Sequence, residues 1–311
     1  MRALVRLEKI GATMSARAGS KGEAEVLVFD AGRPQSRSDD LVTEEPLEIR
    51  LRAAAAGGDE TLAMHGSPAG AARQRTVAVT MRTPGADFEL AAGFLFGEGV
   101  IREPAEIAGI AHCDDPGIDD ARRANVVNVK LRSAALPDLD ALQRHFHMTS
   151  ACGVCGKTSL DALRITRPAT IAAGPAVDAE VLTSLPEKLR SGQGLFGATG
   201  GLHAAALFDA RGRLLAVRED VGRHNAVDKV VGWAFLDGRL PLAEHILMVS
   251  GRTSFEILQK AVMAGVPVVC AVSAPSTLAV SVAREFGVTL IGFLRGERFN
   301  VYAGAERVKR A

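Results

Sequence analysis

Two cysteines separated by two residues are the most reactive feature of this sequence. Cys152 and Cys155 stand in the segment SACGVCGKTS, residues 150–159, where glycines surround the second cysteine and Lys157 follows directly. A helix start, a neighbouring ammonium group and the C-x-x-C spacing all lower a thiol pKa toward about 7. Glycine leaves the backbone free to move. The sequence therefore predicts a reactive thiolate on a mobile loop.

Three kinds of chemistry use such a pair: metal binding, dithiol redox reactions and sulfur transfer. A structural zinc site takes four ligands, and the further candidates here are only Cys113, His145 and His147. A thioredoxin-like dithiol sits at a helix start in a compact βαβ unit, with bulkier residues between its cysteines. Redox chemistry and sulfur transfer both need the thiolate, so the spacing alone leaves them open. Cys270 lies in the apolar run VPVVCAV and is predicted to be buried and inert.

Composition is typical of a soluble globular protein with two domains. The chain has 311 residues, 47% of them apolar, and a formal net charge of +1, so bulk charge gives no reason to expect a nucleic-acid partner. No apolar run approaches the roughly 18 residues of a membrane helix, and the N-terminus lacks a secretory signal. We therefore expect a cytoplasmic protein without membrane attachment. Four cysteines are too few for a disulfide scaffold.

The first half of the chain is predicted to be an α+β domain over residues 41–148. Alternating apolar residues predict strands, and a turn followed by an apolar run predicts a helix. The strands cover 46–52, 75–82 and 125–132, and the turn and helix cover 83–99. Residues 1–40 show no sustained period and are predicted to be a disordered extension. A helical repeat from Leu136 to Met148 precedes the mobile C-x-x-C loop, residues 149–160.

The second half, residues 161–311, has the pattern of a three-layer α/β domain. Three nearly all-apolar segments separated by helical stretches predict a parallel βαβαβ arrangement. Two further strands joined by a short turn predict a hairpin on the same sheet, and an apolar stripe predicts a core-facing helix. These elements are 245–249, 266–272 and 288–294 for the parallel strands, 203–209 and 213–218 for the hairpin, and 226–235 for the helix.

Polar segments follow three of these strands, at the edge where ligands gather in α/β sheets. They are SGRTS at 250–254, SAPST at 273–277 and RGER at 295–298. Thr253 and Glu256 fit a capping box at a helix start, and backbone N–H groups there suit a phosphate. Arg252, Arg295 and Arg298 are thus candidates to converge on one diphosphate. The alternative is that these are ordinary caps and surface arginines.

The loop REDVGRHN, residues 218–225, carries four more candidates. We interpret Glu219 and Asp220 as members of a structural ion-pair cluster with Arg223. His224 is open to two interpretations, a group that orients a ligand or transfers a proton, or a histidine that is simply hydrogen-bonded. The second interpretation is also favoured for His203, which follows TGG.

An ordered series of motifs resembles the formate dehydrogenase accessory sulfurtransferases, sulfur carriers of the FdhD/NarQ type. The resemblance runs from about Glu44 to Gly304, and only the long N-terminal extension has no counterpart. The motifs are, in order, EEPLEIRL, VTMRTPG, GFLFGEG, SACGVCGKTSL, TGGLHAAAL, EDVGRHNAVDKVVG, SGRTSFEILQKA and GFLRGERFNVY.

The resemblance implies a sulfurtransferase that carries sulfur as a persulfide. Cys152 would bear the persulfide and Cys155 would assist its transfer. The sulfur would come from a cysteine desulfurase and pass to molybdenum or tungsten bis(molybdopterin guanine dinucleotide), a client cofactor, before that cofactor enters formate dehydrogenase. The family's cofactor-binding segment falls on six consecutive residues of this chain, Phe293, Leu294, Arg295, Gly296, Glu297 and Arg298. The family also implies a homodimer with no permanently bound metal.

The family's second domain resembles the cytidine deaminase fold, so we expect that fold for residues 161–311. The H-x-E and P-C-x-x-C zinc signature of deaminases is absent from this sequence, and deaminase activity is not expected. Two alternatives to sulfur transfer remain open, a dithiol oxidoreductase and a non-catalytic chaperone for the cofactor.

Overall fold

The computed structural model describes residues 19–54, 74–137, 139, 160, 163–164, 170–171 and 173–309. Cys152 and Cys155 lie outside these residues, as does the loop predicted over 149–160 apart from Leu160. The helix predicted from Leu136 to Met148 also lies almost entirely outside them.

The first half builds a four-stranded sheet with one long helix. Its strand order is β4-β3-β6-β5, with β3 and β6 parallel and the outer pairs antiparallel. The strands are β3 (Glu45–Arg52), β4 (Gln74–Arg82), β5 (Ile107–His112) and β6 (Val126–Leu131), and the helices are α2 (Asp87–Gly97), α3 (Asp120–Ala124) and the 3-10 turn Pro104–Glu106. Leu47, Ile49 and Leu51 alternate along β3 and are fully buried. The predicted strands and helix are confirmed, and β5 is an addition.

The second half builds a six-stranded sheet in the order β13-β12-β11-β10-β8-β9. Strands β10, β11 and β12 are parallel, and the hairpin β8-β9 pairs antiparallel with β10. The strands are β8 (His203–Asp209), β9 (Leu214–Asp220), β10 (His245–Val249), β11 (Val268–Ala271), β12 (Thr289–Arg295) and β13 (Arg298–Ala303). The predicted parallel strands and hairpin are confirmed. The segment RGER is the turn into β13, an antiparallel edge strand that the sequence analysis did not predict.

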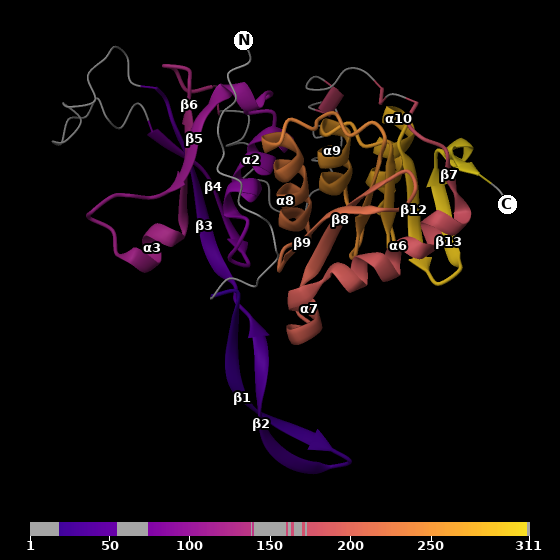
Figure 1. The fold of residues 1–311 in the computed structure, drawn as a ribbon, viewed down its shortest axis with the longest axis horizontal. Helices are drawn as coiled ribbons and strands as arrows, with labels where there is room; N and C mark the ends of the chain where they lie inside the picture. Colours follow the sequence, from indigo (N-terminus) through magenta and orange to yellow (C-terminus); the bar gives the residue numbers. More distant parts are fainter. Residues whose placement is uncertain are drawn as a thin grey trace.

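Helices cover both faces of the large sheet, which gives three layers (Figure 1). The helices are α6 (Ala179–Gly192), α7 (Gly194–Thr199), α8 (Arg223–Leu236), α9 (Phe255–Met263) and α10 (Thr277–Phe286). Leu182, Leu185 and Leu189 of α6 form a separate apolar cluster with one face of the sheet. Helices α8, α9 and α10 pack on the other face. A short pair, β7 (Val177–Asp178) and β14 (Val308–Lys309), and the 3-10 turn Ala305–Arg307 complete the domain.

No helix among the described residues is both long and apolar enough to cross a membrane.

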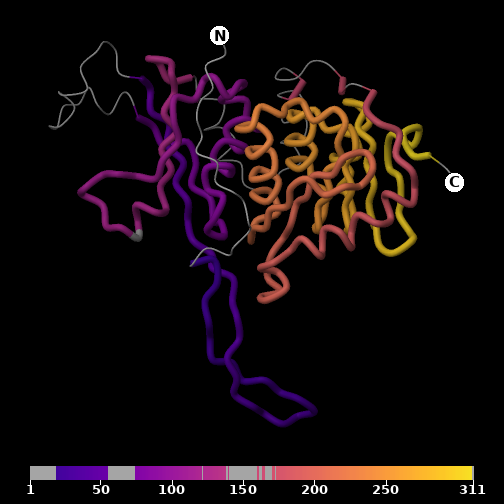
Figure 2. The backbone as a smooth tube through the Cα atoms, in the orientation of Figure 1, coloured from indigo at the N-terminus to yellow at the C-terminus, as the bar shows by residue number. Residues whose placement is uncertain are grey.

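A hairpin extends from the body of the molecule where disorder was expected (Figures 1 and 2). Strands β1 (Lys21–Asp30) and β2 (Arg33–Val42) pair over their whole length. Ala31 and Gly32 have φ angles of 46° and 80°, the positive values that a two-residue hairpin turn requires. The prediction that residues 1–40 are disordered is therefore wrong for 21–40, because the hairpin buries little of either face and its sequence lacks a clear apolar period. Residues 1–18 lie outside the described part of the chain.

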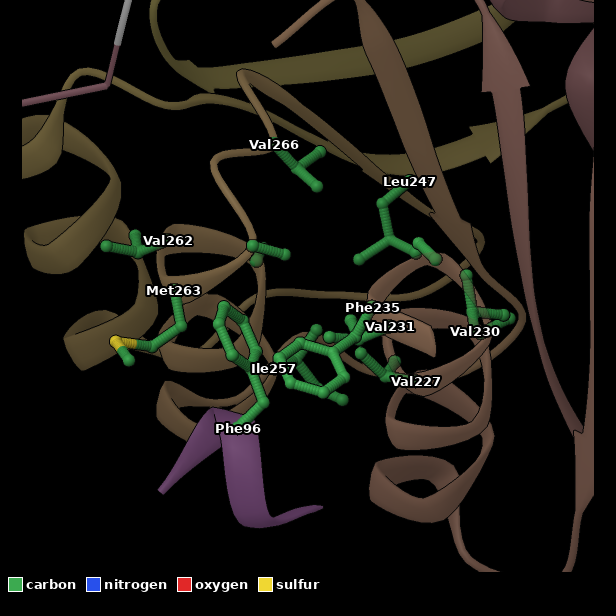
Figure 3. Packing of buried hydrophobic residues seen from close by; sticks show 14 of the residues in the cluster. Phe96, Val227, Val230, Val231, Phe235, Leu247, Ile257, Val262, Met263 and Val266 are labelled. Atoms are coloured by element: carbon green, nitrogen blue, oxygen red, sulfur yellow. The ribbon is translucent and has the colours of Figure 1, made fainter. Parts of the chain in front are cut away.

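The two halves share one continuous apolar core, in which α2 packs against α8. Figure 3 shows Phe96 of α2 among side chains of α8 and α9, and its ring centroid lies 5.2 Å from that of Phe235. Where the two helices cross, a glycine of each helix lies against the backbone of the other helix. A Cβ atom on Gly93 would lie 1.9 Å from the Asp228 carbonyl oxygen, and one on Gly232 would lie 1.8 Å from the Glu89 carbonyl oxygen. The two helix backbones are therefore in direct contact.

This contact predicts that Gly93→Ala destabilises the protein strongly. The added methyl group meets backbone that cannot rotate away, so the helices must separate, at a cost of about 1–3 kcal/mol or more. Gly97→Ala on the same helix is the matched control, because its Cβ would lie at ordinary contact distances of 3.5–3.7 Å from side-chain atoms. Urea unfolding should show a large loss for the first variant and a change below about 1 kcal/mol for the second. Equal effects would contradict this account of the crossing.

Candidate functional site

A cavity of about 720 Å³ opens at the edge of the large sheet where β10, β11 and β12 end. Ser250 follows β10, Val272 follows β11, and Arg295 ends β12. His203, which starts the antiparallel strand β8, lines the same edge. The opposite wall comes from residues 186–196 of α6 and α7. Three adjacent strand ends thus border one cavity, at the place where open α/β sheets bind ligands.

Three of the six residues in the implied cofactor segment line this cavity, namely Leu294, Arg295 and Gly296. Leu294 is fully buried, and Arg295 Nε donates a hydrogen bond to the Val272 carbonyl oxygen at 3.1 Å. Glu297 and Arg298 are exposed on the following hairpin. Arg298 is the strand partner of Arg295, so both arginines project from the same end of this hairpin.

A β-bulge sets the direction of this segment. The register between β12 and β13 shifts between Gly292 and Arg295, and Phe293 has a φ angle of 53°, which is uncommon for a residue with a side chain. The Phe293 N–H donates to the Ser273 carbonyl oxygen at 3.1 Å, and the Phe293 side chain is 40% exposed. A Cβ on Gly292 would lie 3.0 Å from side-chain atoms of Pro275 and Tyr302. Glycine is therefore needed where the bulged strand crosses the SAPST loop.

Arginines surround His203 at the cavity wall. Gly251 lies against the imidazole, since its Cβ would be 3.2 Å from His203 Nδ1 and 3.9 Å from Arg223 Cβ. Burial lowers the pKa of His203, and the charges of Arg223 and Arg252 lower it further. His203 is therefore neutral near pH 7 and offers a hydrogen bond. Arg223 Nε is buried and has no hydrogen-bond partner among the described residues.

The predicted capping box of Thr253 and Glu256 is wrong. Helix α9 begins one residue later, with Ser254 as its N-cap. Thr253 is fully buried and is held by a β-bridge to Pro275, its N–H donating to the Ala274 carbonyl oxygen at 3.2 Å. The bridge between the SGRTS and SAPST loops fixes Thr253 outside the helix, an effect of tertiary structure that the local sequence does not show.

The chain is similar to known proteins over most of its length. The model of the FdhD/NarQ family matches residues 71–309, more than half of the chain. The chain belongs to the FdhD/NarQ family. A protein from Streptomyces avermitilis named "Sulfur carrier protein FdhD" is 52% identical over 280 residues, which cover 89% of this chain and 92% of the relative. A protein of the same name from Mycobacterium tuberculosis is 47% identical over 277 residues, 88% of this chain and 93% of the relative.

The fold of this FdhD/NarQ chain also has a counterpart of known structure. A crystal structure from Desulfotalea psychrophila, of a protein assigned as a formate dehydrogenase accessory protein, matches with a TM-score of 0.67 and 25% sequence identity. The match covers 93% of this chain and 99% of that protein. The mixed α/β fold is therefore shown, and a likeness to cytidine deaminase stays a prediction.

The acidic residues of EDVGRHN have structural roles in this family member, as expected, but their partners are Lys229, Asn225 and backbone N–H groups rather than Arg223. Asp220 is fully buried, and its carboxylate lies 2.6 Å from Lys229 Nζ and accepts the Thr83 N–H at 3.2 Å. Glu219 accepts the backbone N–H groups of Leu195 and Phe196, at 3.0 and 2.8 Å. These contacts fix the first turn of α7, which forms part of the cavity wall.

The cysteines in the described part of this FdhD/NarQ chain are buried thiols. Cys270 is fully buried in β11, and burial raises its pKa, so the prediction that it is buried is confirmed. Cys113 is also buried and free, and follows β5. Among the described residues, no three His, Cys, Asp or Glu side chains are grouped as metal ligands. The reactive thiol chemistry of Cys152 and Cys155 stays a prediction from the sequence, because both residues lie outside the described part of the chain.

His224 gives the protein a pH-dependent stability. Its Nε2 lies 3.1 Å from Ser254 Oγ and 3.7 Å from the Glu256 carboxylate, and burial lowers its pKa to about 4. Because the folded-state value lies below 6.5, the unfolded chain binds the additional proton first as the pH falls. The contribution of neutral His224 to stability is complete above about pH 6.5 and is lost as the pH falls toward 4.

We therefore expect His224→Gln to reduce the loss of stability on acidification. Glutamine keeps a hydrogen-bonding group near Ser254 but takes up no proton. Urea midpoints at pH 7.5 and pH 5 should differ more for the wild-type protein than for the variant, and effects of the other titrating groups cancel in this comparison. If the midpoint changed equally in both proteins between the two pH values, the prediction would be contradicted. That result would mean that His224 has the same pKa in the folded and unfolded states.

Proposed function

We propose that this protein is a cytoplasmic sulfur carrier that supports formate dehydrogenase. It takes sulfur from a cysteine desulfurase as a persulfide on Cys152 and passes it to the molybdenum or tungsten bis(molybdopterin guanine dinucleotide) cofactor before that cofactor is inserted. The observation that carries the proposal is the 52% identity, over 89% of the chain, with a relative named a sulfur carrier protein. The structural match to a formate dehydrogenase accessory protein supports the same assignment.

The loading step is a transfer of sulfane sulfur between two thiols. The Cys152 thiolate attacks the terminal sulfur of the desulfurase persulfide, a new S–S bond forms on Cys152, and the desulfurase leaves as a thiolate. This step changes no overall oxidation state. Release of the sulfur as sulfide takes two electrons, which Cys155 supplies when its thiolate attacks Cys152 and forms a disulfide. A thiol reductant then returns both cysteines to the reduced state.

The cavity at the strand ends supports the assignment of a nucleotide-containing substrate. Its volume of about 720 Å³ lies in the usual range of roughly 300–1,000 Å³ for small-molecule sites. Arg295 supplies a positive charge, and neutral His203 and Ser250 supply hydrogen bonds along the same wall. A guanidinium group binds phosphate oxygens through charge-assisted hydrogen bonds. We infer that the diphosphate of the cofactor lies along this wall at Arg295, whereas Arg252 and Arg298 do not line the cavity.

A second copy of the chain is the partner that we propose for the β1–β2 hairpin. Leu27 and Phe29 lie on one face of the hairpin and are 59% and 66% exposed. A two-stranded hairpin is marginally stable alone, and burial of apolar side chains against another subunit would stabilise it. The proposed oligomeric state is a homodimer, which light scattering of the full chain measures directly.

Sulfur loading tests the proposed function. Incubation with a cysteine desulfurase and cysteine should add the mass of one sulfur atom to the intact protein, and reduction should remove it. Cys152→Ala should abolish the gain, because the attacking thiolate is lost. Cys113→Ala is the control and should load normally, since Cys113 is a buried thiol. Cys155→Ala should load but release sulfide slowly.

The two alternative functions give different results in this experiment. A dithiol oxidoreductase would form a Cys152–Cys155 disulfide with turnover of a redox substrate and would not retain added sulfur. A non-catalytic chaperone would bind the nucleotide but gain no mass. Either result would replace the sulfur-carrier proposal.

Nucleotide affinity tests the proposed phosphate wall. Arg295→Ala should raise the Kd for guanosine diphosphate by about tenfold or more, because a charge-assisted hydrogen bond contributes roughly 1.5–3 kcal/mol. Arg298→Ala should have a smaller effect, since Arg298 is exposed on the turn. Arg239→Ala, at the exposed end of α8, is the control and should leave the affinity unchanged. Unchanged binding in the Arg295 variant would remove this wall from the nucleotide site, while sulfur loading would remain intact in each case.

A further inference from the structure

Helix α7 lines the cavity but has little to hold it in place. Phe196 and the two residues that follow the helix, Gly200 and Gly201, form part of the cavity wall. None of the six residues of α7 is buried, and a helix of this length is not stable in isolation. The position of α7 must therefore come from contacts with neighbouring elements.

Two different elements hold the two ends of α7. At the first turn, the carboxylate of Glu219 on β9 accepts the backbone N–H groups of Leu195 and Phe196. At the other end, strand β2 packs against the helix, and a Cβ atom on Gly201 would lie 3.1 Å from Val42 Cγ1 and 3.8 Å from Val42 Cβ. Val42 is the last residue of β2. The far end of α7 thus lies against the β1–β2 hairpin.

The hairpin base, residues 20–22 and 41–43, is fixed to the first half of the chain. Ser20 is buried, and its Oγ donates a hydrogen bond to the Pro84 carbonyl oxygen at 3.0 Å. The carbonyl oxygen of Ser20 accepts the Thr43 N–H at 3.0 Å. The base therefore joins the hairpin, the first half and α7 at one place.

The hairpin arm, residues 23–40, extends away from the body of the molecule (Figures 1 and 2). A two-stranded hairpin is marginally stable alone, and the pairing of Lys21 with Val42 continues the pairing of the arm. Fraying of the arm therefore loosens Val42, whereas a partner bound to the arm keeps both strands paired. The order of the arm and the position of Val42 thus depend on each other.

We propose that Val42 is a positioning residue for the cavity and couples the hairpin arm to α7. A second copy of the chain bound to the arm holds Val42 against Gly201, which keeps α7 docked and raises the affinity of the cavity for its ligand. The inference rests on the proposed function, because it takes the ligand to be a nucleotide and the partner of the arm to be a second copy.

The coupling is limited in size and acts in both directions. When α7 is undocked, Phe196 leaves the cavity wall, but Ser250 and Arg295 remain because they lie at strand ends of the large sheet. The ligand then binds less tightly and is not excluded. If dimer formation raises the affinity for the ligand by some factor, each bound ligand strengthens the dimer by the same factor.

Hydrogen exchange of the full chain, followed by mass spectrometry, tests the contact between Val42 and α7. Val42→Ala removes the contact, so the backbone N–H groups of residues 195–201 should exchange about fivefold faster or more. Gly201→Ala adds a methyl group 3.1 Å from Val42 Cγ1 and should act in the same direction. Gly197→Ala is the matched control, because its Cβ would meet no neighbouring residue within 4 Å. Alanine is also the better helix former, so exchange should be slower in this variant.

Titration calorimetry with guanosine diphosphate and light scattering test the coupling. Val42→Ala should raise the Kd for guanosine diphosphate by about fivefold, and Gly197→Ala should not raise it. Guanosine diphosphate should shift the wild-type protein from monomer toward dimer, and Val42→Ala should reduce that shift. Leu27→Ser, on the exposed arm, should weaken the dimer and raise the Kd for guanosine diphosphate together.

The outcomes separate this inference from the proposed function. Unchanged exchange of residues 195–201 in Val42→Ala would show that α7 does not depend on the hairpin. A wild-type protein that stays monomeric, binds no guanosine diphosphate, or forms a dimer that the nucleotide does not strengthen would also overturn the coupling. Sulfur loading of Cys152 is measured independently, so a normal gain of mass leaves the sulfur-carrier function standing in each case. If the coupling is found while Cys152 never loads, the inference stands and the sulfur-carrier function falls.

Discussion

The contact between α2 and α8 is the constraint on which the rest of the structure depends. Gly93 and Gly232 bring the two helix backbones so close that no side chain fits between them. Helix packing at this distance lets polar groups of one half reach the backbone of the other. Lys229 donates to the Thr83 carbonyl oxygen at 2.9 Å, and Asn225 donates to that of Met81 at 2.7 Å. A buried charge such as Lys229 is tolerated only when its partners are in place.

The end of strand β9 contacts both this junction and the wall of the cavity. Glu219 and Asp220 are consecutive in β9, and consecutive side chains of a strand point to opposite faces of the sheet. Asp220 faces the junction and pairs with Lys229, whereas Glu219 faces α7 and holds its first turn. A displacement of the first half relative to the second would therefore be transmitted through β9 to the wall that carries Phe196. Glu219 and Asp220 of the motif EDVGRHN thus hold two different parts of the structure.

The periodicity of apolar residues was sufficient to predict the strands that are buried on one face or on both faces. The alternation in β3 and the apolar runs of β10, β11 and β12 each reflect a face or faces covered by other elements. The hairpin β1–β2 was missed because little of it is buried, so its sequence shows weak contrast between its two sides. Helix α6 was not predicted, because Pro186 within it is unfavourable for a helix and obscures the helical spacing of its three buried leucines.

The residues of the candidate site were also only partly predictable from the sequence. The strand-end rule located Arg295 and Ser250, since a parallel sheet brings successive carboxyl ends together. It could not find Gln193 or Phe196, which reach the cavity only because Glu219 positions α7. The bridge that removes Thr253 from α9 joins two loops that are distant in sequence. Such contacts depend on the assembled sheet and leave no local pattern.

The α2–α8 junction also imposes an order of events during synthesis. Its polar contacts join residues 129 to 146 positions apart, so α2 leaves the ribosome on the order of ten seconds before its partner exists. Until then, the apolar surface that α2 later buries has no cover. We therefore expect chaperones to bind the nascent first half, and we expect this long loop closure to slow folding.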